Sequence, residues 1–248
     1  ALRDEDSRGD RQPEHTQIDL EMSFVTARDV LDLVERLMIY IAEACGKKIW
    51  QKPFPVFTYE EAIKQFGADK FDLREENKDQ NTLAFAWVVD FPLFEWDEDQ
   101  KRFTFAHNPF SAPKPEYIKE LIAEENLGHI KAQQYDLVCN GYELASGGVR
   151  ISDPKIQQKV FEIMGLTAEE IEQRFGHLLH AYEYGAPPHA GMAPGVDRLV
   201  MILAGEPNIS EVIAFPKTGN ARDPMMDSPS EVPEKQLKEL HLQIKKSI

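Results

Sequence analysis

Apolar residues recur at helical spacing in four stretches of the chain, and each stretch follows a residue type that caps helices. In the clearest one, apolar positions run from Val30 to Ile41 and Gly46 ends the run. Asp29 stands three residues after Thr26, in the position that completes a capping box. The pattern predicts helices that begin after Thr26, Thr58, Asp153 and Thr167, and two more over residues 199–203 and 234–244.

Between the helices, the pattern favours β-strands. Residues 16–24 alternate polar and apolar, which is typical of a strand with one polar face. That face would carry Gln17, Asp19, Glu21 and Ser23, either toward solvent or on the floor of a polar cavity. Further strands are expected over residues 83–90, 102–107, 135–144, 149–151 and 211–215. Because strands and helices alternate irregularly, we predict an α+β fold with an antiparallel sheet.

Composition narrows the class of protein. The chain has 248 residues, of which 42% are hydrophobic, enough to bury the core of one large domain. No apolar run is long enough to span a membrane, and the charged first residues do not form a signal peptide. A net charge of −15 argues against nonspecific coating of nucleic acid, but leaves a local basic patch open. Cys45 and Cys139 do not form a disulfide framework, and we expect both to be buried in a cytosolic protein.

Two segments near the start and middle of the chain carry candidate chemistry. Residues 3–15 mix arginines with carboxylates, and a turn near residues 7–10 predicts a long hairpin-like loop. Its arginines could bind phosphates, or the loop could be an ordinary solvated turn. Asp136 and Glu143 could hold Mg²⁺ or be surface acids. Their spacing puts them on opposite faces of a regular strand pair unless a bulge or turn intervenes, and Asn140-Gly141 is a turn signal.

The last part of the chain adds two arginines in glycine-rich surroundings. Arg150 follows three small residues and could receive a carboxylate, or it could be structural. Arg198 follows a glycine-rich segment at the start of a predicted helix, where an anion such as a terminal phosphate could bind. A connection over residues 70–82 is polar and is predicted to lie on the surface.

The order of these elements resembles a known family. The runs LRDEDSRGDRQPEHTQIDLEMSF, WVVDFPLFE, AHNPF, YDLVCNGYELASGGVRI, PPHAGMAPGVDRLVMIL and EVIAFPKTGNARDPMMDSPS are similar to bacterial-type aspartyl-tRNA synthetases. These are class II aminoacyl-tRNA synthetases, and the resemblance extends from Arg3 to about Gln243. Motif 2 would occupy residues 1–24 and motif 3 residues 189–204. The resemblance implies a sheet flanked by helices, and ATP-dependent transfer of L-aspartate to tRNA(Asp), and in some members also to tRNA(Asn), in the cytoplasm.

The resemblance also implies roles for individual residues, with Arg3 and Arg198 as the catalytic pair. ATP would contact Arg3, Asp4, Glu5, Gln12, His15, Glu143, Gly195, Val196, Asp197 and Arg198. Aspartate would contact Arg3, Gln17, Asp19, His107 and Arg150, and Mg²⁺ would bind Asp136 and Glu143. The acceptor end of tRNA would meet Asp6, Ser7, Arg8 and Arg11. Departures from the family pattern are His15 and Pro194, each where Phe is usual, and Asn108, where His is frequent.

Two expectations concern the extent of the domain. Residues 1–248 would form part of a catalytic domain without motif 1 and the anticodon-binding domain, and a short link near residues 73–83 would replace an inserted domain. Family members are homodimers, but the main dimer motif is not among these residues. A tRNA-independent paralogue resembling asparagine synthetase, an inactive fragment and a noncatalytic module are the alternatives. The presence of Arg3, Glu143, Arg150 and Arg198 argues against the noncatalytic module.

Overall fold

The computed structural model describes residues 1–4, 7–74 and 78–245. The chain forms two compact units, which we treat separately. One comprises residues 1–15 and 206–248, and the other comprises residues 16–205. The larger unit contains the main sheet and the smaller one contains the charged loop at the start of the chain.

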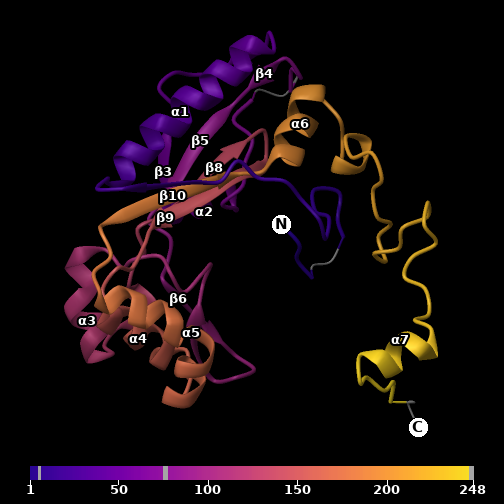
Figure 1. Ribbon diagram of the computed structural model, residues 1–248. Helices are drawn as coiled ribbons and strands as arrows, with labels where there is room; N and C mark the ends of the chain where they lie inside the picture. Colours follow the sequence, from indigo (N-terminus) through magenta and orange to yellow (C-terminus); the bar gives the residue numbers. More distant parts are fainter. Residues whose placement is uncertain (5–6, 75–77, 246–248) are drawn as a thin grey trace. The chain divides into compact units, whose positions relative to one another are not determined.

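A six-stranded sheet organises the larger unit, in the order β1-β10-β9-β8-β5-β3 (Figure 1). All neighbours are antiparallel except β3 and β5, which run parallel, so the predicted α+β fold with an antiparallel sheet is confirmed. The strands are β1 (Leu20–Ser23), β3 (Val56–Thr58), β5 (Phe85–Val89), β8 (Gln134–Cys139), β9 (Tyr142–Val149) and β10 (His189–Pro194). Two small strands, β2 (Lys48–Ile49) and β4 (Thr82–Leu83), pair separately.

Strand β1 is shorter than the alternating pattern over residues 16–24 predicts. Its pairing with β10 matches Leu20 with Met192, and the same register continues to an isolated bridge between Gln17 and Gly195. The interruption lies opposite Pro194, whose carbonyl accepts from the Ile18 amide at 2.9 Å. Proline has no N–H to donate in return, so the ladder loses a bond at that point without losing its register.

Strands β8 and β9 form a hairpin, where the sequence predicted one strand over residues 135–144 and a turn at Asn140-Gly141. The turn is present, with both residues at positive φ. The register shifts between Leu137 and Val138, so Leu144 is an extra residue on β9. A bulge of one residue inverts the alternation of side chains beyond it. Glu143 therefore lies on the same face as Asp136, which a regular hairpin would not allow.

The capped helices begin where the sequence predicts. Thr26 and Asp29 close the start of α1 (Ala27–Ala44), and Asp153 accepts from the Lys155 amide at 2.8 Å ahead of α4 (Pro154–Ile163). The helices α2 (Tyr59–Phe66), α5 (Ala168–Glu183) and α6 (Val196–Ala204) are also present, and α3 (Ile118–Ala123) was not predicted. Helix α1 lies along the sheet in Figure 1, and the Trp87 indole of β5 donates to Glu35 of this helix at 3.2 Å.

The burial predicted for the two cysteines is half right. Cys139 is buried in β8, as expected, but Cys45 is exposed. The buried stripe of α1 ends at Ala42, and the helix itself ends at Ala44. Cys45 would continue the stripe only if the helix extended further, so the prediction of helix core was wrong.

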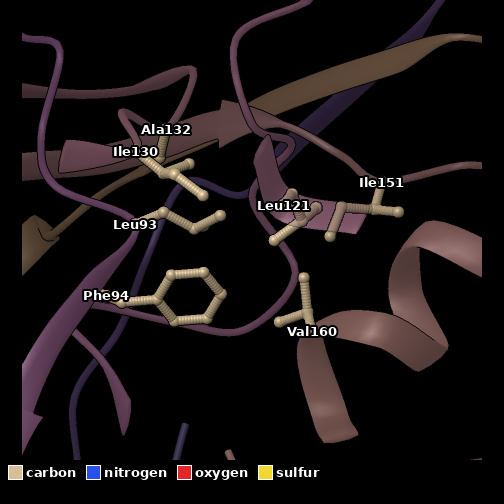
Figure 2. Packing of buried hydrophobic residues seen from close by; sticks show 7 residues of the cluster. All are labelled: Leu93, Phe94, Leu121, Ile130, Ala132, Ile151 and Val160. Atoms are coloured by element: carbon tan, nitrogen blue, oxygen red, sulfur yellow. The ribbon is translucent and has the colours of Figure 1, made fainter. Parts of the chain in front are cut away.

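A hydrophobic cluster lies beside the sheet, where β6 (Phe94–Asp97) pairs with β7 (Arg102–Phe105). Figure 2 shows the apolar side chains directed toward one another. They come from β6, α3, α4 and the segments that flank the sheet strands, and they are Leu93, Phe94, Leu121, Ile130, Ala132, Ile151 and Val160. The cluster fixes α3 and α4 next to the strand ends by burial of apolar surface.

A second cluster lies under α2 and corrects one expectation. Phe71 is 6% exposed and stacks on Phe66 with ring centroids 4.0 Å apart. The Gly141 amide donates to the Phe71 carbonyl at 3.0 Å. The start of the connection over residues 70–82 is therefore packed against the β8–β9 turn, and only its later part has the exposure that a polar surface connection was expected to show.

In the smaller unit, the loop at the start of the chain has the predicted hairpin form. Leu2 pairs with Glu14 and Arg8 with Arg11, which closes the loop around the described residues of the turn. The strand expected over residues 211–215 is absent. A short 3-10 helix, η3 (Ile209–Glu211), lies there instead, because the Asn208 side chain accepts from the Ser210 amide at 2.9 Å. Helix α7 (Glu234–Glu239) is shorter than the predicted 234–244.

Candidate functional site

One face of the sheet in the larger unit gathers most of the predicted site residues. Cross-strand partners share a face, so the register defines two rows across the sheet. The first row runs over Glu21, Gly191, Gly148 and Gln134. The second contains Ala193, Ser146 and Asp136, and the register of β1 puts Asp19 opposite Ala193. The predicted polar face of residues 17–23 is thus continuous with the carboxylate of β8.

Glycines in the first row make room for the side chains of neighbouring residues. A Cβ on Gly191 would lie 2.4 Å from the Glu21 carboxyl carbon, and one on Gly148 would lie 2.7 Å from the Ser111 hydroxyl oxygen. Both distances are too short for any side chain, so Glu21 and Ser111 occupy the space that these glycines leave. The small residues before Arg150 therefore allow close approach of side chains over the sheet.

Arg150 binds Glu21 across this row. Its Nε donates to Glu21 Oε1 at 3.0 Å, and one of its terminal nitrogens donates to the same oxygen. The predicted strand over residues 149–151 is the end of β9 followed by a single bridge from Arg150 to Ser111. A guanidinium has five N–H donors, so Glu21 orients the group and still leaves donors for a second carboxylate.

Asp136 is the most buried of the predicted site residues, at 2% exposure. Its Oδ1 has no hydrogen-bond partner, and its Oδ2 lies 4.0 Å from the His107 Nε2. Burial raises the pKa of the Asp136 carboxyl well above its usual value, and the nearby Glu143 carboxylate raises it further. Withdrawal from solvent lowers the pKa of His107, whose ring packs on Phe91 with centroids 4.5 Å apart.

Glu143 has a cation near each oxygen. The Lys70 Nζ is 2.7 Å from Oε2, and an Arg198 terminal nitrogen is 3.9 Å from Oε1 and donates to the Glu143 carbonyl at 2.6 Å. Burial alone would raise the pKa of Glu143, but Lys70 and Arg198 outweigh it and hold that pKa below its usual value. The structure thus brings Arg198, which the sequence places in motif 3, next to Glu143 of the predicted carboxylate pair.

The start of α6 is hydrogen-bonded to the segment that precedes β1. The Asp197 carboxylate accepts from the Thr16 amide at 3.0 Å, and the Val196 amide donates to the Thr16 carbonyl at 2.9 Å. Gly195 stands at the N-cap of this helix. Gln17 is held by a long contact, 3.5 Å, from its amide nitrogen to the Ala193 carbonyl.

Asn108 is one of the departures from the family pattern. Its side chain binds the Phe110–Ser111 backbone and Gln134, a member of the first row. Its side-chain oxygen accepts from the backbone amides of Phe110 and Ser111, at 2.9 and 3.0 Å. Its amide nitrogen donates to the Gln134 oxygen at 3.2 Å. The Nε2 of Gln134 is buried and has no hydrogen-bond partner.

The carboxylates of Asp136 and Glu143 suit a hard cation. Carboxylate oxygens are the ligands that Mg²⁺ prefers, and a buried oxygen without a donor has a lone pair to offer. No group of three or more His, Cys, Asp or Glu within the described ranges could hold a metal ion by itself. The pair therefore fits a Mg²⁺ whose remaining ligands come from water and from the phosphates of a nucleotide.

The other predicted residues lie in the smaller unit or outside the described residues. Arg3, whose amide donates to the Pro13 carbonyl at 2.8 Å, lies with Asp4 on the hairpin loop. The Gln12 side chain is buried and exchanges two hydrogen bonds with the Lys217 backbone. On the same loop lie Ser7, Arg8, Arg11 and His15. The roles expected for Glu5 and Asp6 fall on residues that the structure does not describe.

Two residues of the site were not assigned a role from the sequence. Glu21 was noted only as one of four polar positions on a strand, and its contact with Arg150 depends on pairing between β1, β10 and β9. Lys70 lay in a run interpreted as a surface connection. The signal for Lys70 was Phe71, an aromatic residue in an otherwise polar run, which could have indicated a packed segment.

Comparison with known sequences identifies the family of the chain. The sequence model of the family described as "tRNA synthetases class II (D, K and N)" matches residues 1–219. The chain belongs to this family of class II aminoacyl-tRNA synthetases. The described helices include none that is both long and apolar enough to cross a membrane.

Curated relatives include the aspartate–tRNA(Asp/Asn) ligases of Rubrobacter xylanophilus and Treponema denticola. The first is 38% identical over 368 aligned residues, covering 98% of this chain and 61% of the relative. The second is 36% identical over 370 residues, covering 99% of this chain and 62% of the relative. The chain thus spans about three fifths of the length of the curated relatives it matches. The aligned stretch exceeds the 248 residues of the chain, so these relatives have residues within it that lack a counterpart here.

Solved structures share the fold. Aspartyl-tRNA synthetase from Entamoeba histolytica superimposes with a TM-score of 0.64 at 22% identity, over 90% of this chain and 46% of that one. The asparaginyl-tRNA synthetase of the same organism, in complex with asparaginyl-adenylate, gives a TM-score of 0.65 at 22% identity, over 90% of this chain and 52% of that one. These likenesses establish the fold and leave the amino acid to be argued from the site.

Proposed function

We propose that the protein is an aspartate–tRNA ligase. In the first step, a carboxylate oxygen of L-aspartate attacks the α-phosphorus of ATP, which forms aspartyl-adenylate and releases pyrophosphate. In the second step, the aspartyl group passes to the 3′ end of tRNA(Asp) and AMP leaves. The observation that carries the proposal is the single polar sheet face, with Arg150 after one end of β9 and with Glu143, Asp136 and Arg198 toward the other end.

Arg150 would select the amino acid. Its guanidinium, oriented by Glu21, is placed to bind the side-chain carboxylate of aspartate with its remaining donors. Asparagine has nearly the same shape but offers a neutral amide, which would leave this arginine without an anionic partner. We assign Gln17, Asp19 and His107 to the rest of the amino-acid pocket, with Asp19 facing the α-ammonium group.

Arg198 and Arg3 would act on the nucleotide. Arg198 is held at the start of α6 beside Glu143, where it can neutralise charge on the terminal phosphate. We assign Arg3 to the α-phosphate from its position in motif 2. Little covalent chemistry is asked of the protein, so the acceleration comes from positioning and from stabilisation of negative charge.

Asp136 and Glu143 would hold Mg²⁺ on the phosphates of ATP. The buried, unpartnered Oδ1 of Asp136 and the adjacent Glu143 carboxylate support this assignment. When bound, the ion offsets the charge of the phosphates and orients pyrophosphate as the leaving group. The protein's own part is to hold the two carboxylates on one face, which the bulge at Leu144 makes possible.

The charged hairpin of the smaller unit would contact tRNA. Its described members Ser7, Arg8 and Arg11, together with Asp6, are our candidates for the acceptor end. The names of the Rubrobacter and Treponema relatives include both tRNA(Asp) and tRNA(Asn), which supports tRNA(Asn) as a second acceptor. We further propose a homodimer that works in the cytoplasm, as its family resemblance implies.

Amino-acid-dependent exchange of pyrophosphate into ATP tests the proposal. Aspartate should support exchange, whereas asparagine and lysine at the same concentration should not. Charging assays with tRNA(Asp) and tRNA(Asn) then identify the acceptors. Exchange without charging of either tRNA would favour a tRNA-independent paralogue, and the absence of aspartate-dependent exchange would overturn the assigned first step.

A further inference from the structure

Lys70 contacts the group that the proposed function gives to the metal. Its Nζ lies 2.7 Å from Glu143 Oε2, while Glu143 Oε1 faces Arg198 at 3.9 Å. The Lys70 and Glu143 side chains are 34% and 25% exposed, so water screens this pair less than it screens an ordinary surface pair. The ammonium thus occupies one of the two oxygens with which Glu143 could bind a cation.

The segment that carries Lys70 is fixed to the same hairpin as Glu143. Phe71 is buried and packs edge-on against Phe57, with ring centroids 5.3 Å apart, and its carbonyl accepts from Gly141, two residues before Glu143. Just beyond, Arg74 Nε donates to Asp72 Oδ1 at 2.9 Å. These contacts hold the backbone of residues 69–74 without help from Lys70, so its side chain is free to serve Glu143.

A purely structural role explains the pair less well. An ion pair that only fastened the segment would duplicate the contacts of Phe71 and Gly141. The Asp136 carboxylate also lies on this face with one oxygen lacking a hydrogen-bond donor. Two carboxyl groups drawn together disfavour each other's ionised form, and a cation supplied by the chain reduces that cost until a ligand cation arrives.

We propose that Lys70 is a tethered counter-cation that occupies Glu143 in the nucleotide-free protein and gives way to Mg²⁺ delivered with ATP. It is a positioning residue, since it acts through Glu143. The inference rests on the proposed function in so far as Asp136 and Glu143 hold the metal. The Lys70 ammonium and a divalent ion would compete for the same carboxylate oxygen of Glu143. The metal alone would therefore bind weakly, and metal and nucleotide would bind together.

Binding of Mn²⁺ without nucleotide tests the competition, because Mn²⁺ takes the same hard oxygen ligands and its free form is measured directly by electron paramagnetic resonance. Lys70→Ala should bind Mn²⁺ at least tenfold more tightly than the unaltered chain. Lys70→Arg keeps a cation and should behave like the unaltered chain. The matched control is Lys78→Ala, since Lys78 lies nearby, is 66% exposed and is 4.0 Å from Asp72.

The direction of the effect separates this role from a structural one. Damage to the fold can only weaken metal binding, so a gain in Lys70→Ala requires that the lysine competed with the ion. The gain should disappear when Glu143→Gln is added to Lys70→Ala. Equal Mn²⁺ affinity for Lys70→Ala and Lys78→Ala, with both variants folded by circular dichroism, would overturn the inference.

Titration of a nonhydrolysable ATP analogue at a series of Mg²⁺ concentrations tests the role of Lys70 separately from the proposed nucleotide site. Lys70→Ala should reach half-maximal analogue binding at a lower Mg²⁺ concentration than the unaltered chain. A gain in Mn²⁺ binding with no analogue binding by any variant would support the role of Lys70 and contradict the assigned nucleotide site. Normal analogue binding with an unchanged Mg²⁺ requirement would contradict the role of Lys70 alone.

Discussion

Two ion pairs lie on one face of the same sheet, and each contains a residue to which we assign a binding role. The two pairs differ in how much of that residue they leave available to a ligand. Just after the end of β9, Arg150 is held by Glu21, which accepts two N–H groups with a single oxygen. Near the start of the same strand, Glu143 is held by Lys70 on one oxygen, and Arg198 faces the other oxygen. Arginine keeps donors to spare, whereas Glu143 has no oxygen left without a facing cation.

We infer from this difference that Glu21 orients Arg150 for a ligand, whereas Lys70 competes with a ligand of Glu143. A partner that leaves binding capacity unused orders the side chain and should improve ligand binding. A partner that occupies the oxygen a ligand needs must leave before the ligand binds. We therefore predict that removing Glu21 weakens binding of aspartate, and that removing Lys70 strengthens binding of metal.

Among the variants of these two ion pairs, Arg150→Leu should have the largest effect on ligand binding. Loss of the charge partner for the substrate carboxylate should cost roughly 2–5 kcal/mol of binding free energy, and so weaken aspartate binding about 30-fold or more. ATP binding should remain within about threefold, since Arg150 is not assigned to the nucleotide. Isothermal titration with each ligand checks this, with Arg28→Leu, an exposed arginine on α1, as the control. Unchanged aspartate affinity would remove Arg150 from the pocket.

Glu143→Gln should come next. The amide keeps the shape of the side chain but lacks the charge that Mg²⁺ requires, so Mg²⁺-dependent ATP binding should weaken roughly tenfold. Binding measured across a Mg²⁺ titration gives the result. Glu98→Gln, 77% exposed on a distant turn, should leave the titration unaltered. If Glu143→Gln also leaves it unaltered, the metal lies elsewhere.

Glu21→Gln should have a smaller effect with the sign opposite to that of Lys70→Ala. Replacing a charge-assisted hydrogen bond by a neutral one costs about 1 kcal/mol, which would loosen the orientation of Arg150 and weaken aspartate binding about fivefold. The same titration as for Arg150→Leu measures it. Tighter aspartate binding would mean that Glu21 competes with the substrate, and the contrast between the two pairs would fail.

Asp72 should show the smallest effect, as a pH dependence of stability. Burial alone would raise the pKa of Asp72, but hydrogen bonds from Arg74 outweigh it, so this pKa lies below the 3.8 of an unperturbed aspartate. A depressed pKa stabilises the fold at pH values above 3.8 and ceases to do so as the pH falls through the lower, folded-state value. The difference in Tm between the unaltered chain and Asp72→Asn should therefore be constant from about pH 5 to 8 and shrink below pH 3.8. An equal difference at pH 3 and pH 7 would contradict this assignment.

The sequence predicted the local parts of this fold well. Helix starts at Thr26, Thr58, Asp153 and Thr167 depend on contacts within one turn, and all four were confirmed. The α+β class with an antiparallel sheet also followed from the pattern. Strand β10 was missed because its run of alanine, glycine and methionine lacks the β-branched residues that mark a strand, and only its two neighbours in the sheet define it.

Candidate site residues could be named from the sequence, but their arrangement could not. Asp136 and Glu143 could be named from the family resemblance, yet their common face depends on an extra residue at Leu144, which no pattern indicated. Lys70 was placed in a surface connection because its neighbours in sequence are polar. Its role depends on a contact between Phe71 and Gly141 that joins positions 70 residues apart, and such long-range packing overrides local composition.

A thermal-shift titration with a nonhydrolysable aspartyl-adenylate analogue tests directly whether this polar face binds aspartyl-adenylate. The asparaginyl and lysyl analogues and the Arg150→Leu variant complete the comparison. We predict a rise in Tm with the aspartyl compound alone, and the loss of this rise in Arg150→Leu. An equal rise with the asparaginyl compound, or an undiminished rise in Arg150→Leu, would contradict it.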